Sequence, residues 1–384
     1  MGFGFRFFVF MQYGKRILVA PLNWGLGHAT RCIPLIQALE NHGFIPIIGS
    51  DGVALELLKK EFPHLEYVAL PSYKIKYAKK GKHFKLKMIW DSPKMIKAIR
   101  REKKELKKMI AHLELDGIIS DNRLGIYSKK IPSVFITHQL NVLTGNTTWM
   151  SSKMHQRIIK KFVACWVPDV AGKPNLTGKL GHLKKSKGLH IKYLGPLSRL
   201  NKEELPKIYD LMVLISGPEP QRSMFEEKVM VQLQKFKGKA LVVRGVIEEE
   251  QRQETLQTES AEITVFNFMQ TQQLQLAFNQ SNQVLSRSGY TTVMDLAKLG
   301  KKAFFIPTPG QYEQEYLAER LQKQGLVPYA TQEGFTLSEL KRIADYKGLD
   351  GFPMHEDYSA LFSVFSAFSK VKENSEPTSL TLST

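Results

Sequence analysis

Cysteine is almost absent from this chain, which has only Cys32 and Cys165 among its 384 residues. Neither cysteine stands at a metal-binding spacing, so the sequence excludes a zinc module and a disulfide framework and is typical of a reducing compartment. The chain also lacks an apolar run of the roughly 18 residues that a membrane-spanning helix needs. We expect no signal peptide, because the aromatic-rich start has neither the length nor the cleavage region of one. Residues 1–10, which precede Met11, are either an alternative-start extension or a shallow membrane anchor.

Acidic residues are fewer than basic ones. The chain has 36 Asp and Glu and 55 Lys and Arg, so its formal net charge is +19. This balance favours anionic partners such as a nucleotide diphosphate, a lipid phosphate or an acidic membrane face. Most of the excess lies between Lys74 and Lys108, where Tyr77, Phe84 and Trp90 interrupt the basic residues. Basic and aromatic side chains together suit an anionic membrane, although a solvated helix face has the same composition. No nucleic-acid-binding motif is recognisable, so we expect no nucleic acid partner.

The order of strand and helix patterns indicates two α/β domains. The length exceeds that of one usual domain, and 43% hydrophobic residues are enough for two cores. Buried-strand patterns alternate with amphipathic helix patterns along the chain, which is typical of parallel sheets. The predicted units are an N-terminal extension (1–14), a first domain (15–200), a second domain (209–352), a C-terminal helix (353–371) and a disordered tail (372–384).

The most informative stretch runs from Gln283 to Gly325 in the second domain. It reads as two successive strand–loop–helix units, and Gly300 ends the first helix as a C-cap glycine does. In a parallel sheet both loops emerge at the carboxyl edge of the strands, where ligands bind, and a helix start offers its amides to an anion. Polar residues, Glu313 among them, gather in these loops and helix starts. The candidate binding residues are Arg287, Ser288, Gly289, Thr291, Thr292, Asp295, Gln311, Gln314 and Glu315.

This stretch resembles the donor-binding region of the MurG-like glycosyltransferases, which are nucleotide-sugar enzymes with the two-domain GT-B fold. The shared pattern is Arg-Ser-Gly at 287–289, two threonines, a helix-ending glycine, a strand ending in Pro307 and Gln314 at the next helix start. The resemblance implies two Rossmann-like domains that face each other across a cleft, with a C-terminal helix that crosses back to the first domain. It also implies that Asp295, which stands where the family usually has Glu, contacts the ribose.

A second glycine-containing loop follows the first predicted strand, at 15–20, and precedes a helix predicted from Ala29. The loop is similar to the Gly-rich first loop of the same family, in which a His faces the cleft near the acceptor. His28 is therefore the candidate general base, because histidine titrates near neutral pH; a capping or simply polar role is the alternative. The accompanying candidates of the acceptor and phosphate loop are Asn23, Gly25 and Gly27.

Two further residues rival His28 for acid–base work. Asp121 and His138 each follow a buried strand of the first domain, at the edge where loops open. Either side chain can equally bond to loop backbone. The sequence alone therefore leaves three candidates for one catalytic role.

Other parts of the second domain supply the remaining candidates for donor binding. Ser216 and Gly217 stand where the family has a phosphate loop, and Arg244 ends a strand where it can face the donor. The resemblance implies that the nucleotide base lies near Phe268 and Met269, although core packing is the more frequent use of such residues.

These residues predict a glycosyltransferase that moves a sugar from a nucleotide sugar, most simply a UDP-sugar such as UDP-GlcNAc, to an acceptor hydroxyl. The resemblance implies inversion at the anomeric carbon, a lipid-linked acceptor, and a cytoplasmic place at the inner face of a bacterial membrane. The chain has no Asp-x-Asp pair, so we expect chemistry without a metal or other cofactor. The alternatives are a hydrolase or epimerase of the same fold, or a protein that binds nucleotide sugars without turnover.

Overall fold

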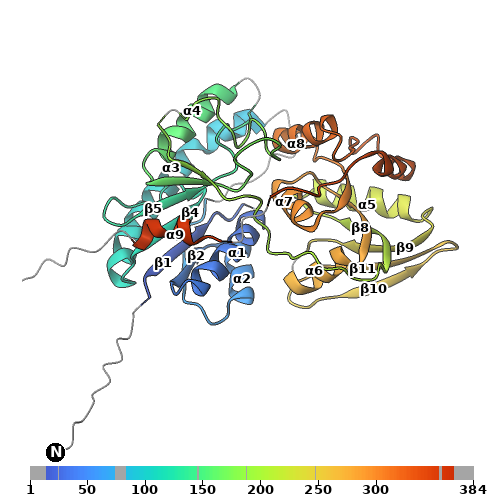
Figure 1. Cartoon of the computed structure of the whole chain (residues 1–384), viewed down its shortest axis with the longest axis horizontal. Coiled ribbons are helices and arrows are strands. Elements are labelled where there is room, and N and C mark those ends of the chain that lie inside the picture. Colours follow the sequence, from blue (N-terminus) through green and yellow to red (C-terminus); the bar gives the residue numbers. More distant parts are fainter. Residues whose placement is uncertain are drawn as a thin grey trace, which may run out of the picture.

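The computed structural model describes residues 14–24, 26–73, 84–144, 147–186, 188–246, 248–353 and 357–366, with backbone alone from 84 to 95. Two sheets, each covered by helices, lie next to each other (Figure 1). Within the described residues, no helix is both long enough and apolar enough to cross a membrane. The architecture is the two-domain GT-B fold that the sequence predicts.

The first sheet has seven parallel strands in the order β3-β2-β1-β4-β5-β6-β7. Chain order reverses between β1 and β4, so the carboxyl ends of these two strands form a switch point where ligands bind in such sheets. Helices α1, α2 and α9 cover one face and α3 and α4 the other. The elements are β1 (Arg16–Pro21), α1 (Gly27–Asn41), β2 (Ile45–Ser50), α2 (Gly52–Glu61), β3 (Tyr67–Ala69), α3 (Phe84–His112), β4 (Gly117–Asp121), β5 (Ser133–Ile136), α4 (Thr148–Ile159), β6 (Ala164–Val167) and β7 (Ile191–Tyr193).

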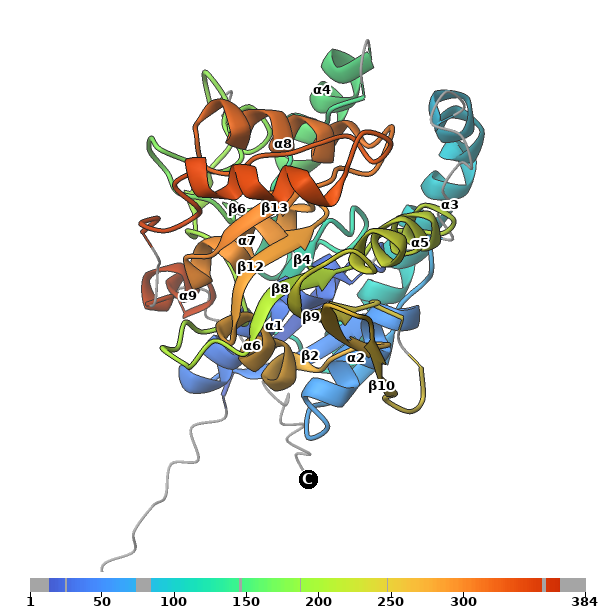
Figure 2. The same cartoon turned by 90° about the vertical axis from the view of Figure 1, so that its right-hand side faces the viewer.

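The second sheet has six strands in the order β10-β11-β9-β8-β12-β13, of which only β10 runs antiparallel. Figure 2 shows α5 and α6 on opposite sides of β8 and β9. The elements are β8 (Tyr209–Leu214), α5 (Gln221–Leu233), β9 (Gly238–Val243), β10 (Gln253–Gln257), β11 (Ala261–Phe266), α6 (Thr271–Asn279), β12 (Ser281–Ser286), α7 (Tyr290–Leu299), β13 (Lys302–Phe305), α8 (Tyr312–Lys323), a 3-10 helix (Leu337–Asp345) and α9 (Ser359–Ser366).

Helix α9 belongs to the second half of the sequence but packs on the first sheet. Phe362 and Phe365 are fully buried there, with ring centroids 6.2 Å from that of Trp166 in β6. Gly117 in β4 leaves room for Phe365, because a Cβ atom at this position would overlap the Phe365 ring. The predicted crossing back to the first domain is confirmed (Figure 1), while residues 367–371 of the predicted helix and the tail lie outside the described residues.

Some elements differ from the sequence-based expectations. Helix α3 begins at Phe84 and contains Pro93, whereas the residue types alone predict a helix that starts at about Pro93 and ends at His112. No element was expected at α5, although its buried Phe225, Val229 and Leu233 follow a helical spacing of four residues. Strand β10 was also missed, because all five of its residues are exposed and no apolar alternation marks it.

Candidate functional site

The first turns of α1 and α7 bring the two domains into contact. The hydroxyl of Thr291 in α7 donates a hydrogen bond to the carbonyl of Gly27, at 3.3 Å. A Cβ atom on residue 27 would lie only 2.7 Å from the Thr291 hydroxyl, so glycine permits this approach. Two predicted loops, one from each domain, therefore meet at one place. Gly25, from the same loop, lies outside the described residues.

His28 and Asp121 form a buried pair at the switch point of the first sheet. His28 lies in the first turn of α1, and its Nδ1 is 3.1 Å from Oδ1 of Asp121 at the end of β4. Burial alone would raise the pKa of Asp121, but the charges of Arg31 and His28 outweigh it and hold this pKa well below its usual range. Burial lowers the pKa of His28, and Arg31 lowers it further against the opposing charge of Asp121. At neutral pH the pair therefore consists of a carboxylate and a neutral imidazole.

Arg31 lies one turn after His28 and joins all three predicted catalytic candidates. Its Nε donates to Asp121 Oδ2 at 2.6 Å, and its two terminal nitrogens lie 2.7 Å from Nδ1 of His28 and of His138. The side chain is only 2% exposed. Arg31 was not among the predicted site residues, although a charged residue three positions after His28 on the buried side of a helix was a usable signal.

His138 connects this cluster to the second domain. Its Nε2 is 3.1 Å from Oε1 of Glu313 in the first turn of α8, and the neighbouring Gln139 amide donates to the same carboxylate. The Tyr290 ring of α7 stacks on His138 with centroids 3.9 Å apart. Burial raises the pKa of Glu313, but the charges of His138 and Arg31 prevail and lower it. The three rival candidates of the sequence thus form one cluster that reaches across both domains.

Arg287, in the loop after β12, is fully buried and holds backbone in place. Its terminal nitrogens donate to the carbonyls of Ile306, Pro307 and Gln221 and to the Gln332 amide oxygen. The guanidinium lies 4.1 Å from the Phe225 ring centroid, and burial lowers its pKa to about 9. These contacts tie the ends of β12 and β13 to the start of α5. In this structure the side chain therefore positions the predicted phosphate loops, and direct contact with a ligand stays a prediction.

Most of the other candidates in the stretch from Gln283 to Gly325 bond to one another or to its backbone. The Ser288 hydroxyl donates to the Gln314 carbonyl, and the Thr308 amide donates to the Gln314 side chain, both at 2.8 Å. Gln314 also donates to Gln311. Glu315 accepts a bond from the Gly310 amide, so these residues fix the loop before α8. Gly289 is the N-cap residue of α7, and Thr292 lies in the first turn after it.

Asp295, the predicted ribose contact, faces Ser198 and Arg199 at the end of the first predicted domain. The Ser198 hydroxyl donates to its carboxylate at 2.6 Å. Burial raises the pKa of Asp295 to about 6, although the Ser198 hydrogen bond and the Arg199 charge oppose the rise. A carboxylate with few partners in a buried place has acceptor capacity left for a ligand.

The remaining donor candidates lie around β8, β9 and β11. Ser216 and Gly217 follow β8, and Gly217 has a φ of 113° that favours glycine. Phe268 is half-buried and faces the first domain, since Lys60 of α2 lies 5.9 Å from its ring centroid. Met269 packs against the core of the second domain, beside α6 and α7.

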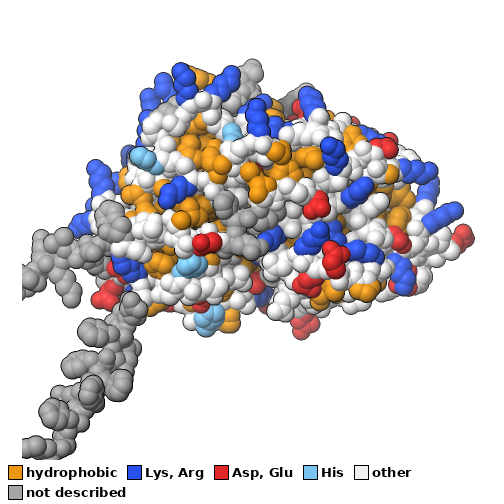
Figure 3. All heavy atoms as spheres, in the orientation of Figure 1, with side chains coloured by type: hydrophobic (Ala, Val, Ile, Leu, Met, Phe, Trp, Pro, Cys, Tyr) orange, Lys and Arg blue, Asp and Glu red, His pale blue; other side chains and the backbone are white. Residues whose placement is uncertain are grey.

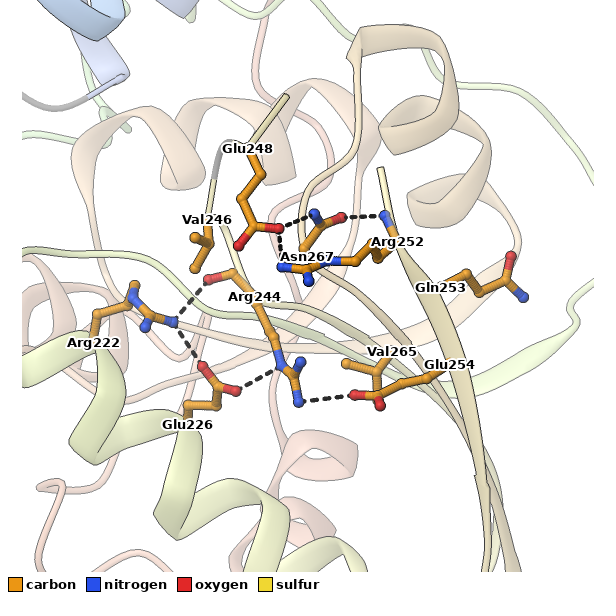
Figure 4. A pocket seen from close by; sticks show the side chains of 10 residues that line it. All are labelled: Arg222, Glu226, Arg244, Val246, Glu248, Arg252, Gln253, Glu254, Val265 and Asn267. Carbon is orange, nitrogen blue, oxygen red and sulfur yellow. Dashed lines mark hydrogen bonds and ion pairs between the residues drawn. The ribbon is translucent and has the colours of Figure 1, made fainter. Parts of the chain in front are cut away.

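Arg244 and Asn23 both have acidic partners. Arg244 lies 2.7 Å from Glu226 and 2.9 Å from Glu254, and it lines a cavity of about 500 Å³ between α5 and β10 (Figure 4). Asn23 donates to Asp51 at 3.2 Å. These contacts are all with acidic side chains of the protein. The ligand-binding roles predicted for Arg244 and Asn23 therefore stay predictions.

The fold and the matching domain define a glycosyltransferase. Residues 222–345 match the model of the glycosyltransferase family 28 C-terminal domain. Among solved structures, MurG of Acinetobacter baumannii matches with a TM-score of 0.53 at 12% identity, over 87% of this chain and 91% of that one. The spinosyn rhamnosyltransferase SpnG matches with a TM-score of 0.59 at 12% identity, over 91% and 95%. These likenesses confirm the GT-B fold.

The resemblance to MurG-like enzymes is also confirmed at the level of sequence. The UDP-N-acetylglucosamine–N-acetylmuramyl-(pentapeptide) pyrophosphoryl-undecaprenol N-acetylglucosamine transferase of Pasteurella multocida (strain Pm70) is 24% identical over 339 residues, which cover 86% of this chain and 88% of that protein. The enzyme of the same name from Haemophilus ducreyi (strain 35000HP / ATCC 700724) is 24% identical over 342 residues, with the same coverage.

Proposed function

We propose that this glycosyltransferase moves N-acetylglucosamine from UDP-N-acetylglucosamine to a hydroxyl of a lipid-linked acceptor. The observation that carries the proposal is the His28–Asp121 pair, which lies at the switch point of the first sheet and beside the start of α7. The names of the two curated relatives support this choice of donor and acceptor. A solved complex of SpnG with thymidine diphosphate supports nucleotide binding by this fold.

His28 is the proposed general base of the transfer. The acceptor oxygen attacks the anomeric carbon, the bond from that carbon to the diphosphate breaks, and the acceptor proton passes to His28 Nε2. This step requires a neutral imidazole with its proton on Nδ1, and the lowered pKa of His28 provides the neutral ring at pH 7. Asp121 stays ionised and compensates the positive charge that His28 acquires. One displacement of this kind inverts the configuration at the anomeric carbon.

The leaving diphosphate lies, in this proposal, between the starts of α5 and α7. Helix N-termini carry unpaired amides and a partial positive charge, which stabilise the charge that develops as the bond breaks. Ser216 and Gly217 border this place, and Arg287 fixes its backbone through the Gln221 and Pro307 carbonyls. The buried Thr308 hydroxyl has no hydrogen-bond partner within the described residues and lies near Gly217. We propose that these groups act without a metal.

The lipid-linked acceptor reaches the site, we propose, from an anionic membrane contacted by the first domain. Side chains of the Lys74–Lys108 segment are described from residue 96 onward, and there α3 exposes its basic residues (Lys97, Arg100, Arg101, Lys103, Lys104, Lys107 and Lys108). Helix α4 contains no acidic residue and exposes Trp149, Met150 and Met154. Figure 3 shows Lys and Arg side chains along the upper edge of the molecule, where α4 lies, and others over the second domain. The protein would then be peripheral on the inner membrane face.

The test measures transfer of labelled N-acetylglucosamine from UDP-N-acetylglucosamine to undecaprenyl-diphosphate-linked acceptor in vesicles. We expect His28→Gln to lower kcat by about 10²–10⁴, the range for general-base catalysis, with UDP binding retained in a thermal-shift assay. His182→Gln is the matched control, because His182 also pairs with a buried aspartate, Asp169, at 3.0 Å but lies outside the cluster. Transfer by His28→Gln at the wild-type rate contradicts the assignment of the base. Binding of UDP-N-acetylglucosamine without any turnover by the wild type would favour a non-catalytic sensor.

A further inference from the structure

Arg31 contacts one ring nitrogen of His28 and one of His138, which constrains where each ring carries its proton. An arginine side chain has only N–H donors and stays protonated in proteins. Because its terminal nitrogens contact Nδ1 of His28 and Nδ1 of His138 at 2.7 Å, both of these atoms must accept. A neutral imidazole has one donor and one acceptor nitrogen, so both rings then carry their proton on Nε2.

The surroundings of His138 agree with this tautomer independently. Its Nε2 faces the Glu313 carboxylate at 3.1 Å and 3.2 Å, and an ionised carboxylate can only accept. Arg31 on one side of the His138 ring and Glu313 on the other thus both require the proton to be on Nε2. For His28 the competing partner of Nδ1 is Asp121 Oδ1, which is more distant, at 3.1 Å, than the Arg31 nitrogen. The same guanidinium also bonds to Asp121, so the carboxylate is satisfied without the His28 proton.

We propose that Arg31 is a positioning residue that holds His28 with its proton on Nε2 before an acceptor binds and so prevents hydrolysis of the donor. This inference rests on the proposed function. In hydrolysis, a water oxygen would bond to the anomeric carbon while the bond to the diphosphate breaks. The water proton would have to pass to His28 Nε2, which has no lone pair in this tautomer. His28 becomes a base only when its Nδ1 proton points at Asp121, which requires the Arg31 nitrogen to leave Nδ1.

The position of Arg31 links the release of His28 Nδ1 to the second domain. The chain of contacts runs from His28 through Arg31 and His138 to Glu313, at the start of α8. Tyr290 of α7 stacks on His138 and lies 5.8 Å from the Arg31 guanidinium. A ligand that displaces Glu313 or Tyr290 therefore acts directly on the group that sets the tautomer of His28.

The first experiment reads the tautomers directly, without ligand or activity. Long-range proton–nitrogen correlation spectra of ¹⁵N-histidine protein at pH 7, assigned with His28→Gln and His138→Gln, are expected to show Nε2–H on both rings. In Arg31→Lys, whose single ammonium cannot reach all three partners, His28 is expected to change to Nδ1–H. Arg123→Lys is the control, because Arg123 is equally buried and paired with Asp51 and Glu102 away from the histidines. An Nδ1–H form of His28 in the wild type overturns the proposal even if Arg31→Lys does not fold.

The second experiment measures release of UDP from UDP-N-acetylglucosamine without acceptor. We expect Arg31→Lys to hydrolyse the donor at least 10-fold faster than the wild type, and Arg123→Lys to stay within twofold of it. A rate in Arg31→Lys equal to or below that of the wild type overturns the protective role. If UDP-N-acetylglucosamine neither binds nor reacts with any of these proteins, the proposed function and the protective role both fail. The spectra alone then decide whether Arg31 sets the tautomers.

Discussion

Asp295 is a carboxylate whose burial costs stability at neutral pH. Because the pKa of Asp295 is raised from 3.8 to about 6, the folded protein binds this proton more tightly than the unfolded chain. The free energy of unfolding therefore falls as pH rises from about 4 to about 6, and roughly 3 kcal/mol is lost at pH 7. We expect Asp295→Asn to be more stable than the wild type at pH 7 by up to this amount. Chemical unfolding at pH 4 and pH 7 measures the difference.

A matched control is Asp169→Asn, for which we expect the opposite change in the free energy of unfolding. Burial raises the pKa of Asp169, but bonds from His182, Thr177 and backbone amides lower it overall, so the carboxylate stabilises the fold at pH 7. At pH 7 we expect Asp169→Asn to be less stable than the wild type and Asp295→Asn to be more stable. If Asp295 contacts the ribose, the more stable Asp295→Asn protein also loses most of its thermal shift with UDP. A loss of stability in Asp295→Asn at pH 7 would contradict the upward direction of the Asp295 pKa shift.

Sequence reasoning identified residues at this site but not their arrangement. His28, Asp121 and His138 were predicted one by one because each follows a strand at the same sheet edge. The contact between His28 and Asp121 joins residues 93 positions apart, and the contact that brings in His138 joins it to Arg31, 107 positions away, so spacing alone does not reveal the cluster. Arg31 was missed because a basic residue on a helix is usually solvated. The donor residues were named from the resemblance, but the turn of Arg287 toward backbone carbonyls depends on three elements packing together.

At the scale of single elements, α9 contributes to a core far from it in sequence. Phe365 is fully buried among α1, β1 and β6. We expect Phe365→Ala to lower the free energy of unfolding by about 3–5 kcal/mol, as other buried Phe-to-Ala substitutions do. Thermal unfolding followed by circular dichroism measures this loss. Ser363→Ala on the exposed face of α9 is the control, and an equal effect of both substitutions would show that the contact with the sheet is unimportant.

Element prediction worked where an apolar pattern was strong. The central strands β4 and β5 are buried along their whole length and contain short apolar runs, Ile118–Ile119 and Val134–Ile136, so their existence followed from the sequence. Gly300 ends α7 with a φ of 62°, as its place after a helical pattern predicted. Strand β10 carries no such pattern, because it is an edge strand whose side chains all face solvent.

The whole molecule presents one edge to the proposed membrane. We expect the protein to co-sediment with vesicles that contain anionic lipid and to be released as salt is raised, because the basic residues of α3 act through screened charge. Trp149→Ser, at a side chain that is 73% exposed, should weaken vesicle binding several-fold and leave soluble-donor binding unchanged. Leu256→Ser, on exposed β10 of the second domain, is the control. Equal binding to neutral and anionic vesicles would contradict the charge-based contact.

The return of α9 to the first sheet also affects how the chain is made. A ribosome completes the last strand of the first domain at Tyr193, which is 169 residues before Phe362, the first of the two buried phenylalanines of α9. Domains often fold in order during synthesis, but here the domain that is made first is completed last. Until then the surface that receives the two phenylalanines stays open to water and to other chains. The nascent first domain therefore keeps this apolar surface exposed until α9 has been made.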